Sequence, residues 1–390
     1  MDNESLQQPN NTPTENTETT EMPSDDVAPG APQPLEPQSE PLLEPQGKRS
    51  IKKIMILAIV LVLLVAGAAV LFIKHRDDTS SKKQSAVSTK VYKVGILDGL
   101  DAFFGDTVTG FKHKMTALGY VEGKNITYDV QKPKELTGNQ AIFKKFVQDK
   151  DDLIVAFPTE PSLEAEQATK DSNIPIISLN SSIEGTSLIE SVQHPGHNLT
   201  GVRFPGPENS VKRLEILHQL APAATRVLVP YLKDYPNVPA QLTAMQASAK
   251  TLGQTLTVVP LAPADVAAYV AGLSATNPGF DAIVGAAEPF TVTPALNGAL
   301  FTFADQHKLP ILGGSISTDS SGPIVSVAPS GSEVGSLGAT LAAKIFKGSS
   351  VGKLSVLTPT SYLQVNLKVA QRLGITPDPG LLSTATVIVK

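Results

Sequence analysis

The feature that most restricts the fold is an internal repeat of helix and strand signals between Val91 and Lys390. Twice, an amphipathic segment ends at a Leu-Gly pair before an apolar stretch: "KMTALGYVEGKNITYDV" and "ASAKTLGQTLTVVP". Glycine just after the last helical residue is the usual left-handed helix cap. Each copy continues with a helical segment and a strand, "DLIVAF" or "DAIVGA", and later with "NIPIISLN" or "KLPILGGS". The repeat predicts one supersecondary unit that occurs twice.

Short Val/Ile/Leu strands that alternate with helices are typical of parallel sheets covered on both faces. The region 91–390 is longer than one compact core usually holds, so we expect two lobes. The predicted fold class is α/β, with two doubly wound parallel-sheet lobes and a ligand cleft between them. We assign 91–203 and 316–355 to the first lobe, and 204–315 and 356–390 to the second. Ligands of such sheets bind at the carboxyl ends of the strands, so the loops that follow the strands are candidate contacts.

A run without charged or strongly polar side chains covers residues 54–73, "IMILAIVLVLLVAGAAVLFI". At about 1.5 Å per helical residue it matches a hydrocarbon core of about 30 Å, and we predict a transmembrane helix there. A long polar segment precedes the run, which favours a retained anchor over a cleaved secretory signal. Lys48, Arg49, Lys52 and Lys53 crowd its amino side, so the tail is predicted to be cytoplasmic and the bulk of the chain extracytoplasmic.

Residues 1–53 are predicted to be a disordered acidic, Pro-rich tail, and residues 74–90 a polar linker. The first 47 residues hold ten of the 37 Asp and Glu of the chain, nine Pro, and no Lys or Arg. Such a segment cannot bury enough apolar surface to offset the entropy of ordering it. A solvated spacer is one interpretation of the tail, and a docking segment for a cytoplasmic partner is the other.

Charge and motif content argue against several other classes of function. The formal net charge is −5, and the Lys and Arg beyond the tail are too scattered for a nucleic-acid-binding patch. The chain has no cysteine, and His194 and His197 lie in a loop, "HPGHN", without the further ligands that a zinc site needs. No phosphate-loop, G-x-S-x-G or comparable catalytic pattern occurs. We therefore expect no enzyme activity, no cofactor, no metal and no nucleic-acid partner.

Two glutamates occupy equivalent points of the repeat, Glu160 in "FPTEPS" and Glu288 in "AAEPFTV". One hypothesis is that one of them pairs with an amine of the ligand, which is a charge-assisted contact of the stronger kind. The alternative is a carboxylate at a helix start, favoured by the helix dipole. Thr159 and Ser162 flank Glu160, where hydroxyls and free N–H groups either receive a ligand carboxylate or cap the helix.

The other candidate ligand contacts lie in loops predicted to face the cleft. Phe103, Phe104 and Phe290 are suited to stack on a flat ligand, although core packing is the more frequent role of such side chains. The remaining candidates lie at strand ends or in the loops that follow them: Asn180, Tyr231, Thr291 and Ser315.

Several segments resemble one known family in wording and in order: "LGYVEGKNITYD", "DLIVA", "IPIIS", "PGHNLTGV", "VKRLEILHQLAP" and "VNLKVAQRLGITPDPGLLSTATVIV". They are similar to ABC-transporter substrate-binding proteins, whose better-known members bind tryptophan and related amino acids. The resemblance begins at about Val91 and runs to the end of the chain. It implies the type I periplasmic-binding-protein fold and capture of a small molecule for an ABC permease. The cleft loops depart from the family, since "AFPTEPSLEA" and "AAEPFTV" replace loops that resemble "ATPSAQ" and "PTDNTV".

Two functions follow as expectations. The first is a single-pass, membrane-anchored extracytoplasmic solute-binding protein that delivers an amino acid or a related compound to an ABC importer. The second is a solute-sensing receptor that signals through its cytoplasmic tail. Ligand-dependent association with a permease favours the first function, and association of the tail with a cytoplasmic protein favours the second.

Overall fold

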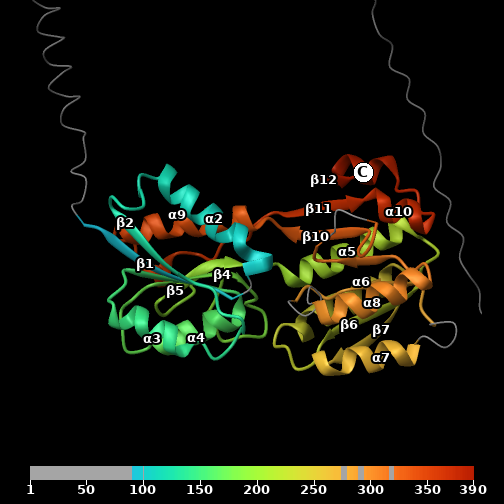
Figure 1. Ribbon diagram of the computed structural model, residues 1–390, viewed down its shortest axis with the longest axis horizontal. Helices are drawn as coiled ribbons and strands as arrows, with labels where there is room; N and C mark the ends of the chain where they lie inside the picture. Colours follow the sequence, from blue (N-terminus) through green and yellow to red (C-terminus); the bar gives the residue numbers. More distant parts are fainter. Residues whose placement is uncertain (1–89, 100, 274–278, 289–293, 316–319) are drawn as a thin grey trace, which may run out of the picture. The chain divides into compact units, whose positions relative to one another are not determined.

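The computed structural model describes a bilobed α/β unit within Ala86–Lys390 (Figure 1). The described residues are 90–99, 101–273, 279–288, 294–315 and 320–390. The predicted tail and the predicted transmembrane helix at 54–73 lie outside them. Among the described residues, none of the helices is both long and apolar enough to cross a membrane.

The first lobe is built around a five-stranded parallel sheet with the order β2-β1-β3-β4-β5. Its strands are β1 (Tyr92–Asp98), β2 (Ile126–Gln131), β3 (Leu153–Phe157), β4 (Ile176–Ser181) and β5 (Leu199–Arg203). Its helices are α2 (Asp101–Ala117), α3 (Gln140–Gln148), α4 (Thr159–Thr169) and α9 (Gly331–Phe346), followed by the 3-10 turn η4 (Val351–Lys353). Helices α2 and α9 cover one face of the sheet, and α3 and α4 cover the other (Figure 1).

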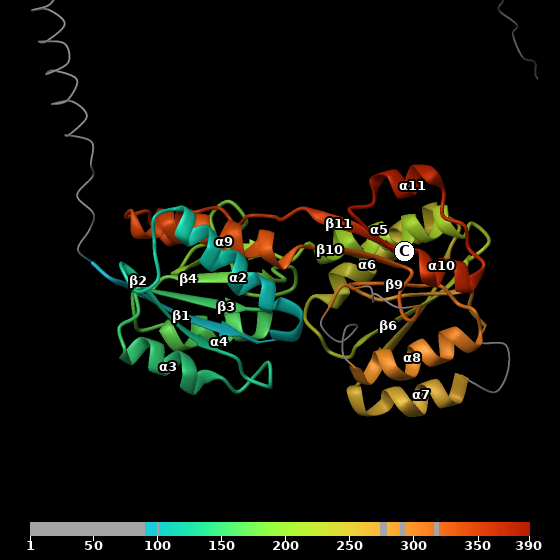
Figure 2. The same cartoon turned by 45° about the horizontal axis from the view of Figure 1, so that its top comes forward.

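The second lobe is built around a seven-stranded sheet with the order β12-β11-β10-β9-β8-β6-β7. Its strands are β6 (Arg226–Leu232), β7 (Thr255–Leu261), β8 (Ala282–Val284), β9 (Ile311–Gly313), β10 (Val325–Pro329), β11 (Ser361–Asn366) and β12 (Val387–Val389). Its helices are α5 (Gly206–Leu220), α6 (Val238–Thr251), α7 (Val266–Leu273), α8 (Pro294–Gln306), α10 (Leu367–Leu373) and α11 (Pro379–Thr384), with the 3-10 turn η2 (Pro263–Asp265). Helices α7 and α8 cover one face, opposite α5 and α6 (Figure 2).

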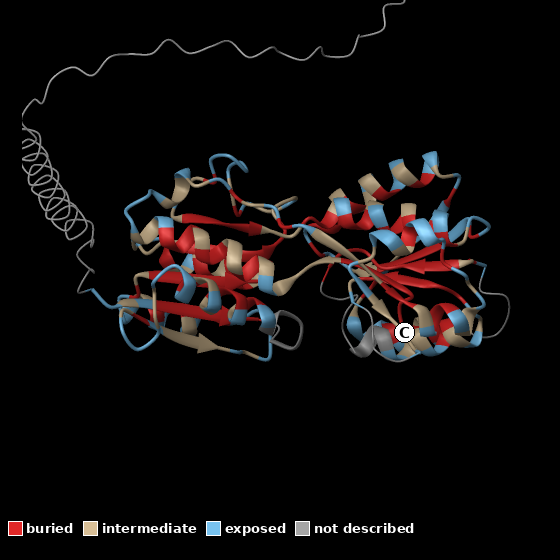
Figure 3. Cartoon of the chain, turned by 90° about the horizontal axis from the view of Figure 1, so that it is seen from above, coloured by how far each residue is buried: buried red, intermediate tan, exposed pale blue. Residues whose placement is uncertain are grey.

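The predicted repeat is confirmed by the sheet topology. The order β7-β6-β8-β9-β10 in the second lobe matches the order β2-β1-β3-β4-β5 in the first. Successive side chains of a strand point to opposite faces of its sheet. In β3, Leu153 and Val155 accordingly pack under α2 and α9, while Ile154 packs with α3 and α4. Figure 3 shows buried residues concentrated in the strands and on the inner sides of the helices. Each lobe therefore has its own core.

The predicted lobe boundaries differ from the structure at β10. The sequence assignment placed 316–355 in the first lobe, but Val325 and Ser326 pair in parallel with β9, which belongs to the second sheet. The chain returns to the first lobe only with α9, which packs so closely on α2 that a Cβ at Gly335 would lie 2.0 Å from the carbonyl oxygen of Thr107. A second difference is β11, which pairs antiparallel to β10 in a sheet predicted to be parallel.

Candidate functional site

Each sheet has its own topological switch point, which lies between two neighbouring strands whose connections run in opposite directions along the sheet. In the first lobe it lies between β1 and β3, and in the second between β6 and β8. Crevices beyond the carboxyl ends of such strands are the usual ligand sites of this architecture. The loops to consider are thus the start of α4 after β3, the segment 285–288 after β8, and the turn 233–237 after β6.

Glu160 stands in the first turn of α4, directly beyond β3. Burial raises the pKa of its carboxyl, while contacts with its own backbone N–H and with Tyr235 oppose that rise, and Glu164 adds to it. Its Oε2 atom is buried and makes no hydrogen bond within the described residues. The position of Glu160 agrees with the hypothesis of a carboxylate at a helix start. Its Oε2 is also the acceptor that the hypothesis of pairing with a ligand amine requires.

Glu288 follows β8 at the corresponding point of the second lobe and is 6% exposed. Its Oε1 accepts a hydrogen bond of 3.2 Å from the backbone N–H of Leu232, at the end of β6. Arg213 of α5 interacts electrostatically with Glu288. Its guanidinium donates to the carbonyl oxygens of Gly285 (2.7 Å) and Val327 (3.0 Å). Burial lowers the pKa of Arg213 to about 10, and the Glu288 carboxylate opposes this shift.

Tyr235 contacts one of the two glutamates across the lobes and is affected by the charge of the other. It belongs to the turn between β6 and α6 and is 7% exposed, and its hydroxyl interacts with the side chains of Thr159 and Glu160 in the other lobe. Burial, followed by the charge of Glu160, raises the pKa of Tyr235 well above its usual value, and the charge of Glu288 contributes as well. Tyr235 of the second lobe thus contacts Glu160 of the first lobe, within the electrostatic field of Glu288.

Thr159 and Ser162 lie on the same helix but have different surroundings. Thr159 is 3% exposed, and its Oγ1 accepts a 3.0 Å hydrogen bond from the backbone N–H of Ser182. Ser162 is fully buried and its hydroxyl donates to the carbonyl oxygens of Ala156 (3.0 Å) and Pro158 (2.8 Å). The structure therefore places Thr159 beside Tyr235 and turns the Ser162 hydroxyl into the first lobe.

Asn180 sits at an irregularity of β4 with a positive φ of 50°. Its amide nitrogen donates to the hydroxyl oxygen of Thr107 over 3.3 Å, which links β4 to α2. Tyr231 is half-buried on β6, and Ser315 is exposed after β9.

The predicted aromatic contacts fall largely beyond what the structure describes. Phe103 and Phe104 lie in the first turn of α2, and their side chains are outside the described part. Phe290 and Thr291 are outside the described residues altogether.

Sequence reasoning missed the residues that join the lobes. The sequence analysis predicts Tyr231 as a ligand contact, but the tyrosine that contacts Thr159 and Glu160 is Tyr235. Ser182, Asn237 and Gln241 were also missed, although all are at most 3% exposed and hydrogen-bonded. The available signal was a tyrosine and an asparagine around a proline, just before a helix.

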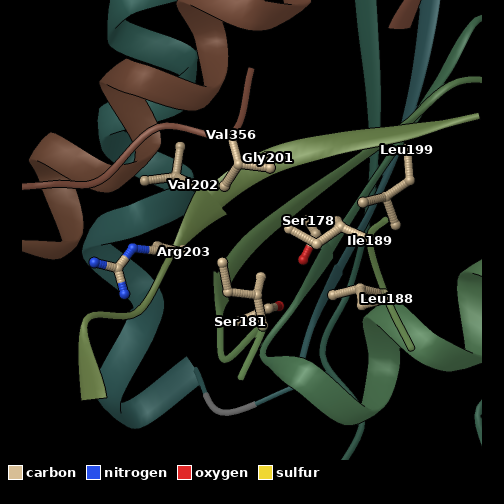
Figure 4. Close-up of a pocket in the computed structure, with 10 residues that line it drawn as sticks. Ser178, Ser181, Leu188, Ile189, Leu199, Gly201, Val202, Arg203 and Val356 are labelled. Carbon is tan, nitrogen blue, oxygen red and sulfur yellow. The ribbon is translucent and has the colours of Figure 1, made fainter. Parts of the chain in front are cut away.

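A small cavity of about 10 Å³ lies inside the first lobe, away from the two glutamates (Figure 4). Leu188, Ile189 and Leu199 line it together with Ser178 and Ser181. A volume of this size holds about one water molecule, so the cavity is too small for a solute. Figure 4 shows the guanidinium of Arg203 pointing away from both serines.

Known proteins that are similar to this chain include substrate-binding proteins of ABC transporters and an amino-acid-binding protein. A family model described as ABC transporter substrate binding protein matches residues 97–389. A tyrosine-binding protein of Clostridioides difficile (strain R20291) is 28% identical over 257 residues, which is 64% of this chain and 70% of that protein.

Two solved structures show the same fold. A conserved domain protein of Vibrio cholerae has a TM-score of 0.68 at 26% identity, covering 77% of this chain and 100% of that one. A Streptococcus pneumoniae domain solved with L-Trp has a TM-score of 0.66 at 22% identity, again covering 77% and 100%.

Proposed function

Because the chain belongs to the family of ABC transporter substrate-binding proteins, we propose that it captures an aromatic amino acid and delivers it to an ABC permease. The family binds solutes, so the chain is a binding protein and not an enzyme, as the sequence predicted. The resemblance stated from the sequence motifs is likewise confirmed.

The observation that carries this proposal is the contact of Tyr235 with Glu160 across the lobes, in the field of the buried Glu288. We propose that a ligand ammonium group pairs there with Glu160, whose buried Oε2 makes no hydrogen bond within the described residues, and is also attracted by the charge of Glu288. Charge-assisted hydrogen bonds of this kind are about twice as strong as neutral ones. The tyrosine-binding relative supports an amino acid as the ligand class.

The rest of an amino acid has matching groups in the same region. We propose the start of α4 as the position of the ligand carboxylate, because helix starts attract anions. On the basis of the sequence alone, we propose that Phe103, Phe104 and Phe290 stack on the ligand ring.

The test is a thermal-shift and calorimetric titration of the full chain with four compounds. They are L-tyrosine, L-tryptophan, tyramine, which lacks the carboxylate, and 3-(4-hydroxyphenyl)propionic acid, which lacks the amine. A ligand that binds only the folded state stabilises it by about 2.7 kcal/mol at a hundredfold excess over Kd. We expect the amino acids to bind, tyramine to bind more weakly and the acid without an amine to bind least. Binding of a sugar, and of none of these compounds, would overturn the proposal.

We also propose that residues 54–73 anchor the protein in the cell membrane, with the tail in the cytoplasm and the lobes outside. This part rests on the sequence, through the apolar run and the basic residues before it. Alkaline extraction of membranes should leave the full chain in the pellet, and a protease added to intact cells should digest the lobes but not the tail. Release of the intact chain by alkali would contradict the anchor.

A further inference from the structure

A row of buried polar groups connects the segments that carry the two glutamates. From the first lobe, the N–H of Ser182 donates to Thr159, and the Ser182 hydroxyl accepts from the amide nitrogen of Asn237 in the second lobe. The oxygen of the Asn237 side chain accepts from Gln241 over 2.8 Å. The side chain of Gln241 in turn binds both backbone groups of Ala287. Its Oε1 accepts from the N–H over 2.7 Å, and its Nε2 donates to the carbonyl oxygen over 3.0 Å.

The two ends of this row of polar groups adjoin the two glutamates of the candidate site. Thr159 precedes Glu160, and Ala287 precedes Glu288. Asn237 provides the link between the lobes, because its two side-chain ends bind Ser182 of the first lobe and Gln241 of the second.

Asn237 stands at a position where asparagine usually has another task. It is the N-cap residue of α6, yet its side chain makes no capping hydrogen bond. Asparagine is favoured at N-caps because its oxygen accepts from the first turn of the helix. Here the whole amide serves the row of polar groups, at 2% exposure.

The lobes are also in close contact beside this link. A Cβ at Gly185, in the loop after β4, would lie 2.4 Å from the carbonyl oxygen of Pro236. A buried polar group that loses its hydrogen-bond partner destabilises the arrangement, because its desolvation is no longer compensated. The arrangement is therefore favoured only while Ser182 and Asn237 remain together.

We propose that Asn237 is a positioning residue for ligand capture: its bond to Ser182 of the other lobe orients Gln241 and so holds the Ala287–Glu288 segment against the ligand. This inference rests on the proposed function and adds to it the element that couples lobe closure to the second carboxylate.

The test compares Asn237→Ala and Ser182→Ala with Ser181→Ala in the full chain. Ser181 is a suitable control because it is the adjacent buried serine, and its hydroxyl bonds to Ser162 and Leu179 of its own lobe. We expect Asn237→Ala and Ser182→Ala each to weaken L-tyrosine binding by about tenfold, because each leaves a buried partner unpaired. The double variant should be little worse than either single one, while Ser181→Ala binds as the wild type does.

Two further readouts separate positioning from a general loss of structure. In a Glu288→Gln background, Asn237→Ala should have almost no additional effect on affinity, since it acts through Glu288. The distance between the lobes should increase in ligand-free Asn237→Ala protein. It is measured between labels at Lys124→Cys and Lys250→Cys, which are unique sites because the chain has no cysteine.

Three results would overturn the inference. One is an unchanged lobe distance, and another is an unchanged affinity in both Asn237→Ala and Ser182→Ala. The third is an equal loss of affinity with and without Glu288. A wild type that binds no amino acid but still shows the distance change would refute the proposed function alone.

Discussion

Glu160 and Glu288 occupy corresponding places in the two lobes, after β3 and after β8, but their surroundings differ. Glu288 is held within its own lobe by the N–H of Leu232 and lies near the buried cation of Arg213. Glu160 begins a helix, retains a buried oxygen without a hydrogen bond in the described part of the chain, and reaches Tyr235 of the other lobe.

The difference shows that a repeated topology does not repeat the environment of its side chains. The carboxylate of the second lobe is fixed before any ligand arrives. The carboxylate of the first lobe carries a burial penalty that a cationic group would relieve, because desolvation disfavours its charged form. We therefore expect the loss of Glu288 to reduce stability as well as binding, and the loss of Glu160 to reduce binding alone.

The largest expected effect comes from the cation behind Glu288. Arg213→Ala leaves the carbonyl oxygens of Gly285 and Val327 without their donor and should lower the free energy of unfolding by about 3–5 kcal/mol. Urea denaturation measures this loss. Arg226→Ala is the control, because Arg226 forms an exposed ion pair with Asp281 and should matter far less. Equal effects of the two variants would refute a special role for Arg213.

Glu288→Gln should have the next largest effect on stability. It weakens the hydrogen bond from Leu232 and removes a charge that favours the cationic form of Arg213. We expect a loss of about 1.5 kcal/mol, as for a hydrogen bond to a charged group, in the same urea experiment. A variant as stable as the wild type would remove the contrast between the two glutamates.

Glu160→Gln should act in the opposite direction on the ligand-free protein. Because the folded-state pKa of Glu160 is raised, the folded state binds more protons, and stability falls as pH rises from the ordinary value of 4.5 through the raised pKa. The variant lacks this loss, so its melting temperature should equal or exceed that of the wild type at pH 8 and approach it at pH 4. Ligand affinity should nevertheless decrease. If both Glu160→Gln and Glu288→Gln bound L-tyrosine normally, the amine contact would be refuted.

Asp151 provides the smallest effect and a control for the previous one. This buried aspartate lies just before β3, at the end opposite Glu160, and burial raises its pKa to about 6. Stability should thus fall as pH rises from 3.8 to about 6, and Asp151→Asn should abolish that fall. Melting curves across this pH range test it. Affinity for L-tyrosine should not change in Asp151→Asn. A change would mean that the removal of any buried carboxylate alters binding, so the effect of Glu160→Gln would not be specific to the ligand site.

The alternation of short apolar strands with Gly-capped helices determined the lobes and the repeat, because these signals are local and periodic. The same repeat marked Glu160 and Glu288 as equivalent positions. The assignment of β10 to the second sheet was not predictable in this way, since it depends on pairing with β9 and on the close packing of α9 against α2.

The sequence by itself thus determined the two-lobed α/β fold, the family motifs and the equivalent positions of Glu160 and Glu288 in the repeat. Only the tertiary structure decided that Tyr235 contacts Glu160 of the other lobe and that Asn237 joins Ser182 to Gln241. The physical reason is that strand order and side-chain partners across the lobes depend on contacts between residues far apart in the chain, which no local pattern records.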